Sequence, residues 1–285
     1  MPKKKKEEKS SLKEFFVSRK TYPKKRLGQN FLRSADVLER IGEIAGISMD
    51  DEVLEIGAGL GALTLFLGTR TSRVIAIEKD KSLIEELKRK VSNLRNVEII
   101  PNDALRIEFG EFYRERKIKV VSNLPYSISS PILIKLVEER ELFSLLVLMV
   151  QREVGERIAA SPGSRAYGSI SVIVQTYMEV SIELHVPPDA FWPRPKVDSV
   201  VIKLAPLPIP RIPMLDGKLF RSIVRAAFSS RRKTLSNSLR SLLSKEQVEE
   251  LLQLSGIDGR RRAETLSVEE FGRLSDEALK MKLSP

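Results

Sequence analysis

The sequence predicts an α/β domain, built on a parallel sheet with helices on both faces, followed by a small all-helical domain. Short apolar runs alternate with helix-periodic segments from Ser34 to about residue 204, which is typical of a parallel sheet covered by helices. The segment 205–213 contains four prolines and indicates a linker. Beyond this linker, every segment with a clear period is helical.

The hydrophobic period predicts each element. A helix begins at Ser34, because apolar residues recur at helical spacing as far as Ala45. Apolar runs then predict strands at 53–56, 73–77, 97–100, 119–122 and 145–150, and periodic segments predict helices at 60–67, 82–91, 131–138, 151–160 and 168–175. The alternating segments 179–185 and 199–204 flank a proline-rich loop and predict an antiparallel pair at one sheet edge. Four helices are predicted after the linker, at 217–228, 232–243, 245–254 and 268–281.

The charge of the chain is compatible with a polyanionic partner. Lysine and arginine number 49 against 38 aspartate and glutamate residues, which gives a net charge of +11. Such a surplus attracts phosphates, although a basic protein without that kind of partner explains it equally well. Residues 1–26 form a basic N-terminal arm, and its run Lys3–Lys6 predicts either a solvated tail or an accessory RNA contact.

The composition also excludes several kinds of chemistry. Cysteine is absent, which excludes disulfides, thiolate metal sites and cysteine nucleophiles. The single histidine, His185, argues against a histidine metal site and against a Ser-His-Asp triad. The longest apolar runs are too short to span a bilayer, and the N-terminus lacks the apolar stretch of a signal peptide. We expect a cytoplasmic enzyme that uses an organic cofactor, with neither a metal nor a membrane partner.

A glycine-rich loop lies between the first predicted strand and the next helix, in Glu55-Ile56-Gly57-Ala58-Gly59-Leu60-Gly61-Ala62. Glycine lets the backbone turn sharply and approach a ligand closely. The loop satisfies the G-x-G-x-x-G/A pattern of dinucleotide enzymes, and a tight turn without a ligand would also explain it. The loop alone therefore indicates a nucleotide-like ligand only weakly.

Two acidic residues follow the next two predicted strands. Glu78 is placed to accept both hydroxyls of a ribose, and Asp103 is placed to accept from an adenine amino group. Ligands of open parallel sheets bind at these carboxyl ends of the strands. A dinucleotide would leave Asp103 without a role, and Glu55 suits a cationic sulfonium or amino group better than a pyrophosphate. The ordered set favours S-adenosylmethionine (SAM), a nucleoside with a charged amino-acid tail.

The fourth strand is followed by Asn123-Leu124-Pro125-Tyr126, the most specific feature of the chain. An adenine N6 amine is a poor nucleophile, because its lone pair is delocalised into the ring. The Asn123 side-chain oxygen and the Leu124 carbonyl could accept hydrogen bonds from its two N–H groups and so favour a tetrahedral nitrogen. Tyr126 could stack on an extruded base. The alternative is a β-turn with a buried tyrosine.

Basic residues crowd the first half of the predicted helical domain: Arg221, Arg225, Arg231, Arg232 and Lys233. If the helix continues, three of them fall at spacings of four and seven and share one face. Such a face can straddle phosphates without reading sequence, and a solvated helix face is the alternative. The net charge and the neighbouring active site favour RNA contact. The run Arg260–Arg262 has the same two interpretations.

Five segments together resemble the KsgA-type ribosomal RNA adenine dimethyltransferases, the small-subunit dimethyladenosine transferases. They are Lys25–Leu32, Glu55–Gly59, Asn123–Tyr126, Phe191–Ser199 and Ala227–Leu235, and they follow the family order over most of the chain. Gly-Gln-Asn-Phe-Leu together with Asn-Leu-Pro-Tyr is highly specific. One departure is that serine stands before the Arg231-Arg232 pair, where relatives often carry Gln or His.

This resemblance implies a fold, a cofactor and a set of site residues. Residues 27–206 would form a Rossmann-like class I SAM-dependent methyltransferase domain, and residues 214–285 a helical RNA-binding domain. Asn30 and Leu32 would cover the SAM, and further contacts would come from the strand ends, at Glu55, Gly57, Gly59, Glu78, Asp103 and Asn123. Phe191 could close the other side of the target base, although by its sequence alone it more simply packs beneath a rigid loop.

The resemblance also implies the substrate. The enzyme would convert two adjacent adenines in the 3′-terminal hairpin of 16S (small-subunit) rRNA to N6,N6-dimethyladenosine during ribosome biogenesis. The partner would be this rRNA or a pre-assembled small subunit, and we expect the protein to act as a monomer.

Three other functions compete with this one. An Erm-type methyltransferase acts on large-subunit rRNA and shares the Gln-Asn-Phe segment, but typically has isoleucine where this chain has Leu124. A non-catalytic RNA-binding assembly factor could keep the fold, although the intact set of site residues argues against lost catalysis. A nicotinamide oxidoreductase is the third alternative, and Asn-Leu-Pro-Tyr has no evident role in one.

Overall fold

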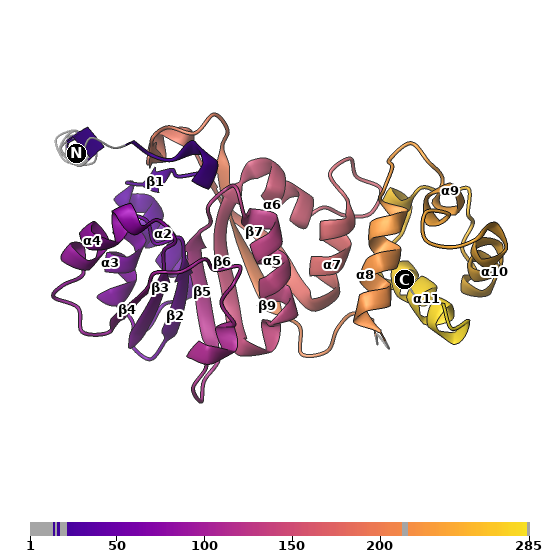
Figure 1. The fold of residues 1–285 in the computed structure, drawn as a ribbon, viewed down its shortest axis with the longest axis horizontal. Coiled ribbons are helices and arrows are strands. Elements are labelled where there is room, and N and C mark those ends of the chain that lie inside the picture. Colours follow the sequence, from indigo (N-terminus) through magenta and orange to yellow (C-terminus); the bar gives the residue numbers. More distant parts are fainter. Residues whose placement is uncertain (1–13, 15, 18–21, 213–215, 284–285) are drawn as a thin grey trace. The chain divides into compact units, whose positions relative to one another are not determined.

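A computed structural model describes residues 14, 16–17, 22–212 and 216–283. The chain divides into two compact units, shown in Figure 1. The catalytic unit contains the described residues up to Gly155 together with Ser181–Pro206, and the helical unit contains Glu156–Val180 and the described residues after Pro206. The predicted run Lys3–Lys6 lies outside the described residues.

A seven-stranded sheet forms the centre of the catalytic unit, in the order β4-β3-β2-β5-β6-β9-β7. The strands β4 to β6 are parallel, and β9 pairs antiparallel with β6, so that β9 and β7 lie at one edge as predicted. The bounds are β2 Glu52–Ile56, β3 Arg73–Ile77, β4 Val97–Ile100, β5 Ile118–Asn123, β6 Phe143–Gln151, β7 Met178–Val186 and β9 Ser199–Pro206.

The register of the parallel strands aligns their carboxyl ends. Ile56 pairs with Ile77, and Ile77 pairs with Ile100, so β2, β3 and β4 end at the same level. The next residues of each strand therefore emerge at one edge of the sheet. These are the positions of Gly57, Glu78 and, slightly later, Asp103.

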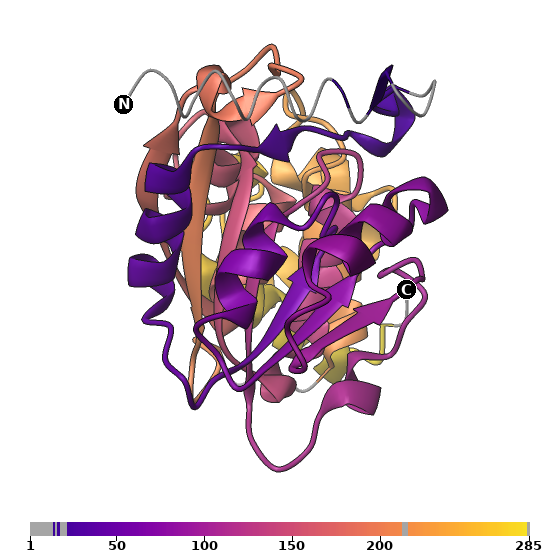
Figure 2. The same ribbon diagram turned by 90° about the vertical axis from the view of Figure 1, so that its left-hand side faces the viewer.

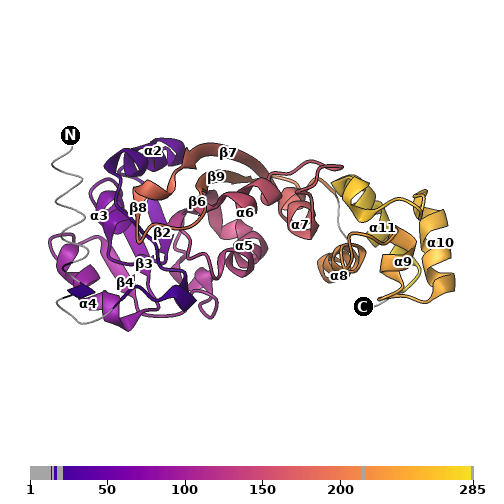
Figure 3. The ribbon, with the colours of Figure 1, turned by 90° about the horizontal axis from the view of Figure 1, so that it is seen from above.

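Helices cover both faces of this sheet. α2 (Ala35–Ala45) contacts β5, β6 and β9, and α5 (Ser129–Glu138) lies on the opposite side of the strands (Figure 3). The remaining helices are α3 (Ala62–Gly68), α4 (Lys81–Lys90) and α6 (Arg152–Ile158). The core consists of fully buried aliphatic side chains from the strands and the inner helix faces, among them Val53, Val74, Leu67 and Leu87. Burying such side chains is the main favourable term in folding.

A short second sheet ties the N-terminal segment to the proline-rich loop. β1 (Phe31–Leu32) pairs antiparallel with β8 (Phe191–Trp192). Figure 2 shows this indigo segment crossing above the central strands. The segment is therefore placed over the carboxyl edge of the sheet.

The helical unit consists of α7 (Ser169–Tyr177), α8 (Gly217–Ala227), α9 (Leu235–Leu239), α10 (Lys245–Ser255) and α11 (Val268–Lys280). α7 packs against α8 and α11, which is why residues 156–180 group with the chain beyond the linker. The predicted helix 232–243 is reduced to five residues, because Thr234 caps α9 by accepting from the N–H of Asn237. In the described residues, no helix is long and apolar enough to cross a membrane.

Candidate active site

A cavity lies at the carboxyl ends of β2, β3, β4 and β5. The empty space in this cavity, together with the open solvent at its mouth, is about 1070 Å³. Its walls come from the glycine loop, from the residues after β3 to β5 and from the N-terminal segment, and they include Asn30, Leu32, Glu55, Gly57, Gly59, Glu78, Asp103, Asn123, Leu124 and Tyr126. The structure thus brings together all the predicted cofactor residues and three of the four predicted catalytic ones.

The glycine loop has no space for a side chain at Gly57, where it lies closest to Pro125. Gly57 has a φ of 79°, in the left-handed region that favours glycine. A Cβ at Gly57 would lie 2.7 Å and 2.8 Å from two ring carbons of Pro125. The loop after β2 therefore rests directly on the tetrapeptide after β5, and this contact joins the cofactor wall to the reaction wall.

Glu78 is held by backbone N–H groups. Its Oε2 accepts from Gly59 at 2.7 Å, and its Oε1 accepts from Asp80 at 2.7 Å. Burial raises the pKa of this carboxyl above its ordinary value, and the N–H donors oppose that shift. Each carboxylate oxygen has a second lone pair, so Glu78 can still accept from hydroxyl groups of a ligand.

Glu55 is a buried acid with an unsatisfied oxygen. Its side chain is only 2% exposed, and Oε2 has no hydrogen-bond partner within the described part of the chain. Burial raises the pKa of Glu55 from 4.5 to about 8. A polar or cationic ligand group in the cavity could supply the missing partner.

Asp103 is an ionised acceptor at the third strand end. Its Oδ2 receives a hydrogen bond from Lys79 at 2.6 Å, and its Oδ1 accepts from the N–H of Leu105 at 3.2 Å. Partial burial acts against ionisation, but these two donors outweigh it and lower the pKa of Asp103. Asp103 is thus suited to accept a hydrogen bond from a neutral amino group.

The tetrapeptide after β5 offers two acceptors and an aromatic ring. The Asn123 amide nitrogen donates to the carbonyl of Asn30 at 3.1 Å, which leaves its Oδ1 as an acceptor. The N–H of Leu124 donates to Met149 at 3.1 Å, and its carbonyl receives no hydrogen bond from the described residues. The Tyr126 hydroxyl is hydrogen-bonded to Ser199 at 2.7 Å, so the ring is anchored at its far end.

Phe191 is not part of the cavity wall. Its ring is 2% exposed and belongs to the main hydrophobic core, and its backbone pairs with Leu32 in the β1–β8 sheet. A large apolar ring gains more from this burial than from exposure at the cavity mouth. The structure supports packing rather than stacking for Phe191, which corrects its inclusion among the catalytic residues.

Three residues of the site have contacts that sequence analysis does not identify. Asp80, two residues after Glu78, accepts from Lys24 and from Gln29 of the N-terminal segment. The only local signal for Asp80 is its position as the N-cap of α4, where it accepts from Ser82. The contacts with Lys24 and Gln29 join residues more than 50 positions apart and have no periodic signature.

The predicted basic cluster lies in the helical unit, but not on one continuous helix. α8 ends at Ala227, and Arg231, Arg232 and Lys233 are exposed in the turn before α9. The expected helical spacing of Arg232 with Arg221 and Arg225 is therefore wrong. Residues 231–233 instead form an exposed basic turn, in which Arg231 also donates to the carbonyl of Arg165 at 2.7 Å.

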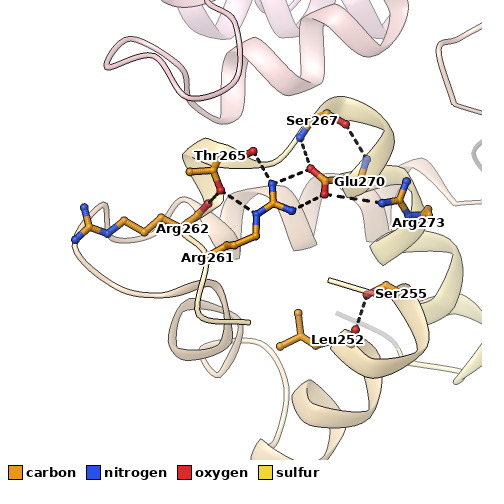
Figure 4. Close-up of polar contacts among 8 residues, drawn as sticks. All are labelled: Leu252, Ser255, Arg261, Arg262, Thr265, Ser267, Glu270 and Arg273. Carbon is orange, nitrogen blue, oxygen red and sulfur yellow. Dashed lines mark hydrogen bonds and ion pairs between the residues drawn. The ribbon is translucent and has the colours of Figure 1, made fainter. Parts of the chain in front are cut away.

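The run Arg260–Arg262 is divided between structural and exposed residues. Arg261 forms an ion pair with Glu270 and donates to the carbonyl of Thr265 at 2.7 Å, as Figure 4 shows. Arg260 is paired with Asp258 at 3.1 Å. Arg262 is exposed, and its side chain points away from this network (Figure 4). Arg261 thus stabilises the helical unit.

Among the described residues, no group of three or more His, Cys, Asp or Glu side chains could hold a metal ion. The polar groups of the cavity are instead suited to an organic ligand with a ribose, an amino-bearing ring and a cationic group. A glycine loop, two strand-end acids and an acceptor pair on one parallel sheet define a Rossmann-like methyltransferase of class I.

Comparison with known sequences identifies the family within this class. The family model described as ribosomal RNA adenine dimethylase matches residues 21–280, and the chain belongs to that family. A relative named Ribosomal RNA small subunit methyltransferase A, from Clostridium acetobutylicum, is 47% identical over 255 residues, which are 89% of this chain and 92% of the relative. The protein of the same name from Geobacter metallireducens is 45% identical and covers 88% of this chain and 94% of its own.

Solved structures agree with this assignment. A dimethyladenosine transferase from Plasmodium falciparum has a TM-score of 0.73 at 28% identity, and the match covers 89% of this chain and 98% of that one. The 23S rRNA methyltransferase ErmE has a TM-score of 0.64 at 26% identity, and covers 87% of this chain and 99% of its own. Both matches extend over nearly the whole described chain.

Proposed function

We propose that this chain is a SAM-dependent adenine N6,N6-dimethyltransferase of small-subunit rRNA, which modifies two adjacent adenines in the 3′-terminal hairpin. The observation that carries the proposal is that Asn123 and Leu124 line the same cavity as Glu55, Glu78 and Asp103. The names and the high identity of the small-subunit relatives support the choice of substrate.

The cavity residues fit SAM group by group. Glu78 would accept from the ribose hydroxyls, and Asp103 would accept from the adenine amino group of the cofactor. The unsatisfied Oε2 of Glu55 would face the cationic end, with the backbone of Gly57 and Gly59 beside it. Asn30 and Leu32 would cover the cofactor from the N-terminal segment. When bound, SAM supplies an activated methyl group.

The chain's own contribution to the reaction is to prepare the target amine. Asn123 Oδ1 and the Leu124 carbonyl accept hydrogen bonds from the two N6–H groups. These hydrogen bonds favour the tetrahedral nitrogen on which the lone pair becomes available. The Tyr126 ring stacks on the extruded base, a contact typically worth about 1–3 kcal/mol. Each methyl transfer to the nitrogen replaces one N6 proton, which is released to solvent. One acceptor then receives a hydrogen bond from the remaining N–H group before the second transfer.

The basic turn 231–233, together with Arg221 and Arg225, supports contact with the RNA backbone. Three adjacent exposed cations on one turn attract phosphates without reading base sequence. All the groups assigned to the cofactor and the target base lie in one chain, so catalysis requires no second copy, and we propose a monomer. Small-subunit rRNA as a substrate also supports a cytoplasmic location.

Two alternatives are less well supported. The large-subunit function of ErmE would fit the same fold, but identity to that structure is 26%, against 47% to the small-subunit relative. A non-catalytic assembly factor would have no need of the buried, unsatisfied Glu55 beside intact acceptors at Asn123 and Leu124. A binding role in subunit assembly could nevertheless coexist with catalysis.

The cofactor assignment is tested by calorimetry with SAM and NAD. We expect SAM to bind and NAD not to bind. Glu78→Ala should lower SAM affinity by about 10- to 100-fold, the cost of a lost charged hydrogen bond of roughly 1.5–3 kcal/mol. Glu78→Gln should also weaken SAM binding, because its NH2 group would face a backbone N–H of Gly59 or Asp80. Tighter binding of NAD than of SAM would refute the methyltransferase assignment.

A further inference from the structure

Asp80 is the most densely hydrogen-bonded carboxylate beside the cavity, yet it does not line it. Its side chain is 2% exposed. Oδ1 accepts from Lys24 Nζ at 2.6 Å and from the Ser82 hydroxyl at 2.7 Å, and Oδ2 accepts from Gln29 Nε2 at 2.8 Å. Gln29 Oε1 in turn accepts from the N–H of Lys24 at 2.8 Å. We name this group, Lys24, Gln29 and Asp80, the N-terminal clamp.

The clamp fixes a segment that touches both halves of the active site. Residues 27–32, which include Gln29 of the clamp, line the cavity. The Asn30 carbonyl accepts from the amide nitrogen of Asn123 at 3.1 Å. A Cβ at Gly28 would lie 3.0 Å from the backbone nitrogens of Tyr126 and Ser127, so the backbone at Gly28 rests on the tetrapeptide. Movement of this segment would therefore disturb the orientation of the Asn123 amide.

On its other side, the clamp is hydrogen-bonded to Glu78, the residue predicted to bind the ribose of the cofactor. The N–H of Asp80 donates to Glu78 Oε1 at 2.7 Å, and the Asp80 side chain also caps α4. Burial acts against ionisation of Asp80, but the donors of Lys24, Ser82 and Gln29 outweigh it and lower its pKa. Asp80 is thus a charged residue, held between the cofactor wall and the segment that covers the cavity.

We propose that Asp80 is a positioning residue that, through Lys24 and Gln29, closes residues 27–32 over SAM and holds Asn123 in its reactive orientation. This inference rests on the proposed function. The N-terminal clamp couples the retention of SAM to the orientation of the Asn123 amide, because residues 27–32 line the cavity and also contact Asn123. Since Lys24 is partly exposed, at 36%, the clamp can open without unfolding the core and so let the cofactor exchange.

Asp80→Asn and Lys24→Met test the clamp. Asparagine is a good N-cap, so Asp80→Asn keeps the start of α4 and removes both the charge that faces Lys24 and the oxygen that accepts from Gln29. Each variant should release SAM about tenfold faster in stopped-flow measurements, the scale of a weakened charge-assisted hydrogen bond. The double variant should be no faster than Asp80→Asn alone, because Asp80→Asn already removes the ion pair with Lys24.

A second readout separates positioning from general destabilisation. The single-turnover methylation rate with saturating SAM should fall several-fold in Asp80→Asn, and should fall much less when Asn123 is already alanine. Asp51→Asn is a matched control, because it removes a partly buried ion pair with Lys119, at 2.9 Å, at the other end of the sheet. This control should release SAM at the wild-type rate.

The outcomes distinguish the clamp from the function on which it rests. SAM release within twofold of wild type in Lys24→Met and Asp80→Asn would overturn the clamp alone. Fully additive effects in the double variant would do so as well. If Asp80→Asn fails to fold, Lys24→Met provides the same test from the partly exposed side of the ion pair. A wild-type chain that does not bind SAM would overturn the proposed function and the clamp together.

Discussion

At the scale of single residues, the amide of Asn123 has a defined orientation before any substrate binds. The Asn123 side-chain nitrogen donates a hydrogen bond to the Asn30 carbonyl. The Asn123 side-chain oxygen therefore needs no reorganisation to accept a hydrogen bond from a target amine. Preorganised polar groups of this kind act mainly in the transition state, because their contacts strengthen as charge and geometry change. Asn123 is therefore expected to affect the rate more than cofactor affinity.

Asn123→Ala should lower the single-turnover methylation rate by roughly 100-fold or more, the scale observed when one preorganised donor or acceptor is removed. SAM affinity in the same variant should change far less. The monomethylated amine must keep its remaining proton on an acceptor, so N6-monomethyladenosine should accumulate. Wild-type rates for both methyl transfers would contradict the role assigned to Asn123.

Glu55 predicts a pH dependence of stability in the unliganded chain. Burial raises its folded-state pKa from 4.5 to about 8, so the folded state binds the proton more tightly than the unfolded state. The stabilisation is complete below pH 4.5 and is lost as pH rises through about 8, with a limit on the order of 5 kcal/mol.

Glu55→Gln should remove this loss, so its unfolding free energy should decline less than that of wild type between pH 5 and pH 8. Urea denaturation at several pH values in that range measures the difference. Glu86→Gln is the control, because Glu86 is also buried but is paired with Arg89 at 2.9 Å. Parallel curves for wild type and Glu55→Gln would show that Glu55 is not protonated in the folded chain.

At the scale of elements, the site residues that directly follow a strand could be predicted from the sequence, and those on non-periodic segments could not. Gly57, Glu78 and Asn123 each follow an apolar run, and the parallel register then brings them together. Phe191 was less predictable, because neighbouring proline-rich residues carry no period that separates a buried ring from an exposed one. The N-terminal clamp was not predictable, since it depends on how a non-periodic segment crosses the sheet.

The helical unit shows a second limit of prediction. Residues 232–243 have helical spacing, but Thr234 caps α9 and starts it late, and the helix ends at Leu239. Local capping hydrogen bonds compete with helix propagation at Ser and Thr, and this segment contains Thr234, Ser236, Ser238 and Ser241. As a result the basic residues 231–233 lie on a turn and not on a helix face.

Reversing the charge of Arg231, Arg232 and Lys233 to glutamate should lower RNA affinity and flatten its salt dependence, because fewer counterions are released on binding. SAM affinity should be unchanged. The matched control reverses Arg114, Arg116 and Lys117, an exposed basic segment that precedes β5 at the end opposite Asn123. Binding measured at several salt concentrations would contradict the assignment if the slope changed only in the control.

At the scale of the whole molecule, the groups to which we assign roles are distributed over the two units. The catalytic unit contains every group assigned to the cofactor and to the target amine, and the helical unit contains the basic turn. Family membership and high identity over almost the whole chain show that both parts belong to one enzyme type. The net charge of +11 is consistent with a substrate as strongly negative as ribosomal RNA.

The central claim is tested most directly by incubating the protein with radiolabelled SAM and small ribosomal subunits that lack the two dimethyladenosines. After digestion to nucleosides, the label should be in N6,N6-dimethyladenosine and should approach four methyl groups per subunit, two on each of two adenines. Large subunits should remain unlabelled. Label in large-subunit rRNA instead, or label that stops at N6-monomethyladenosine with the wild-type chain, would contradict the account.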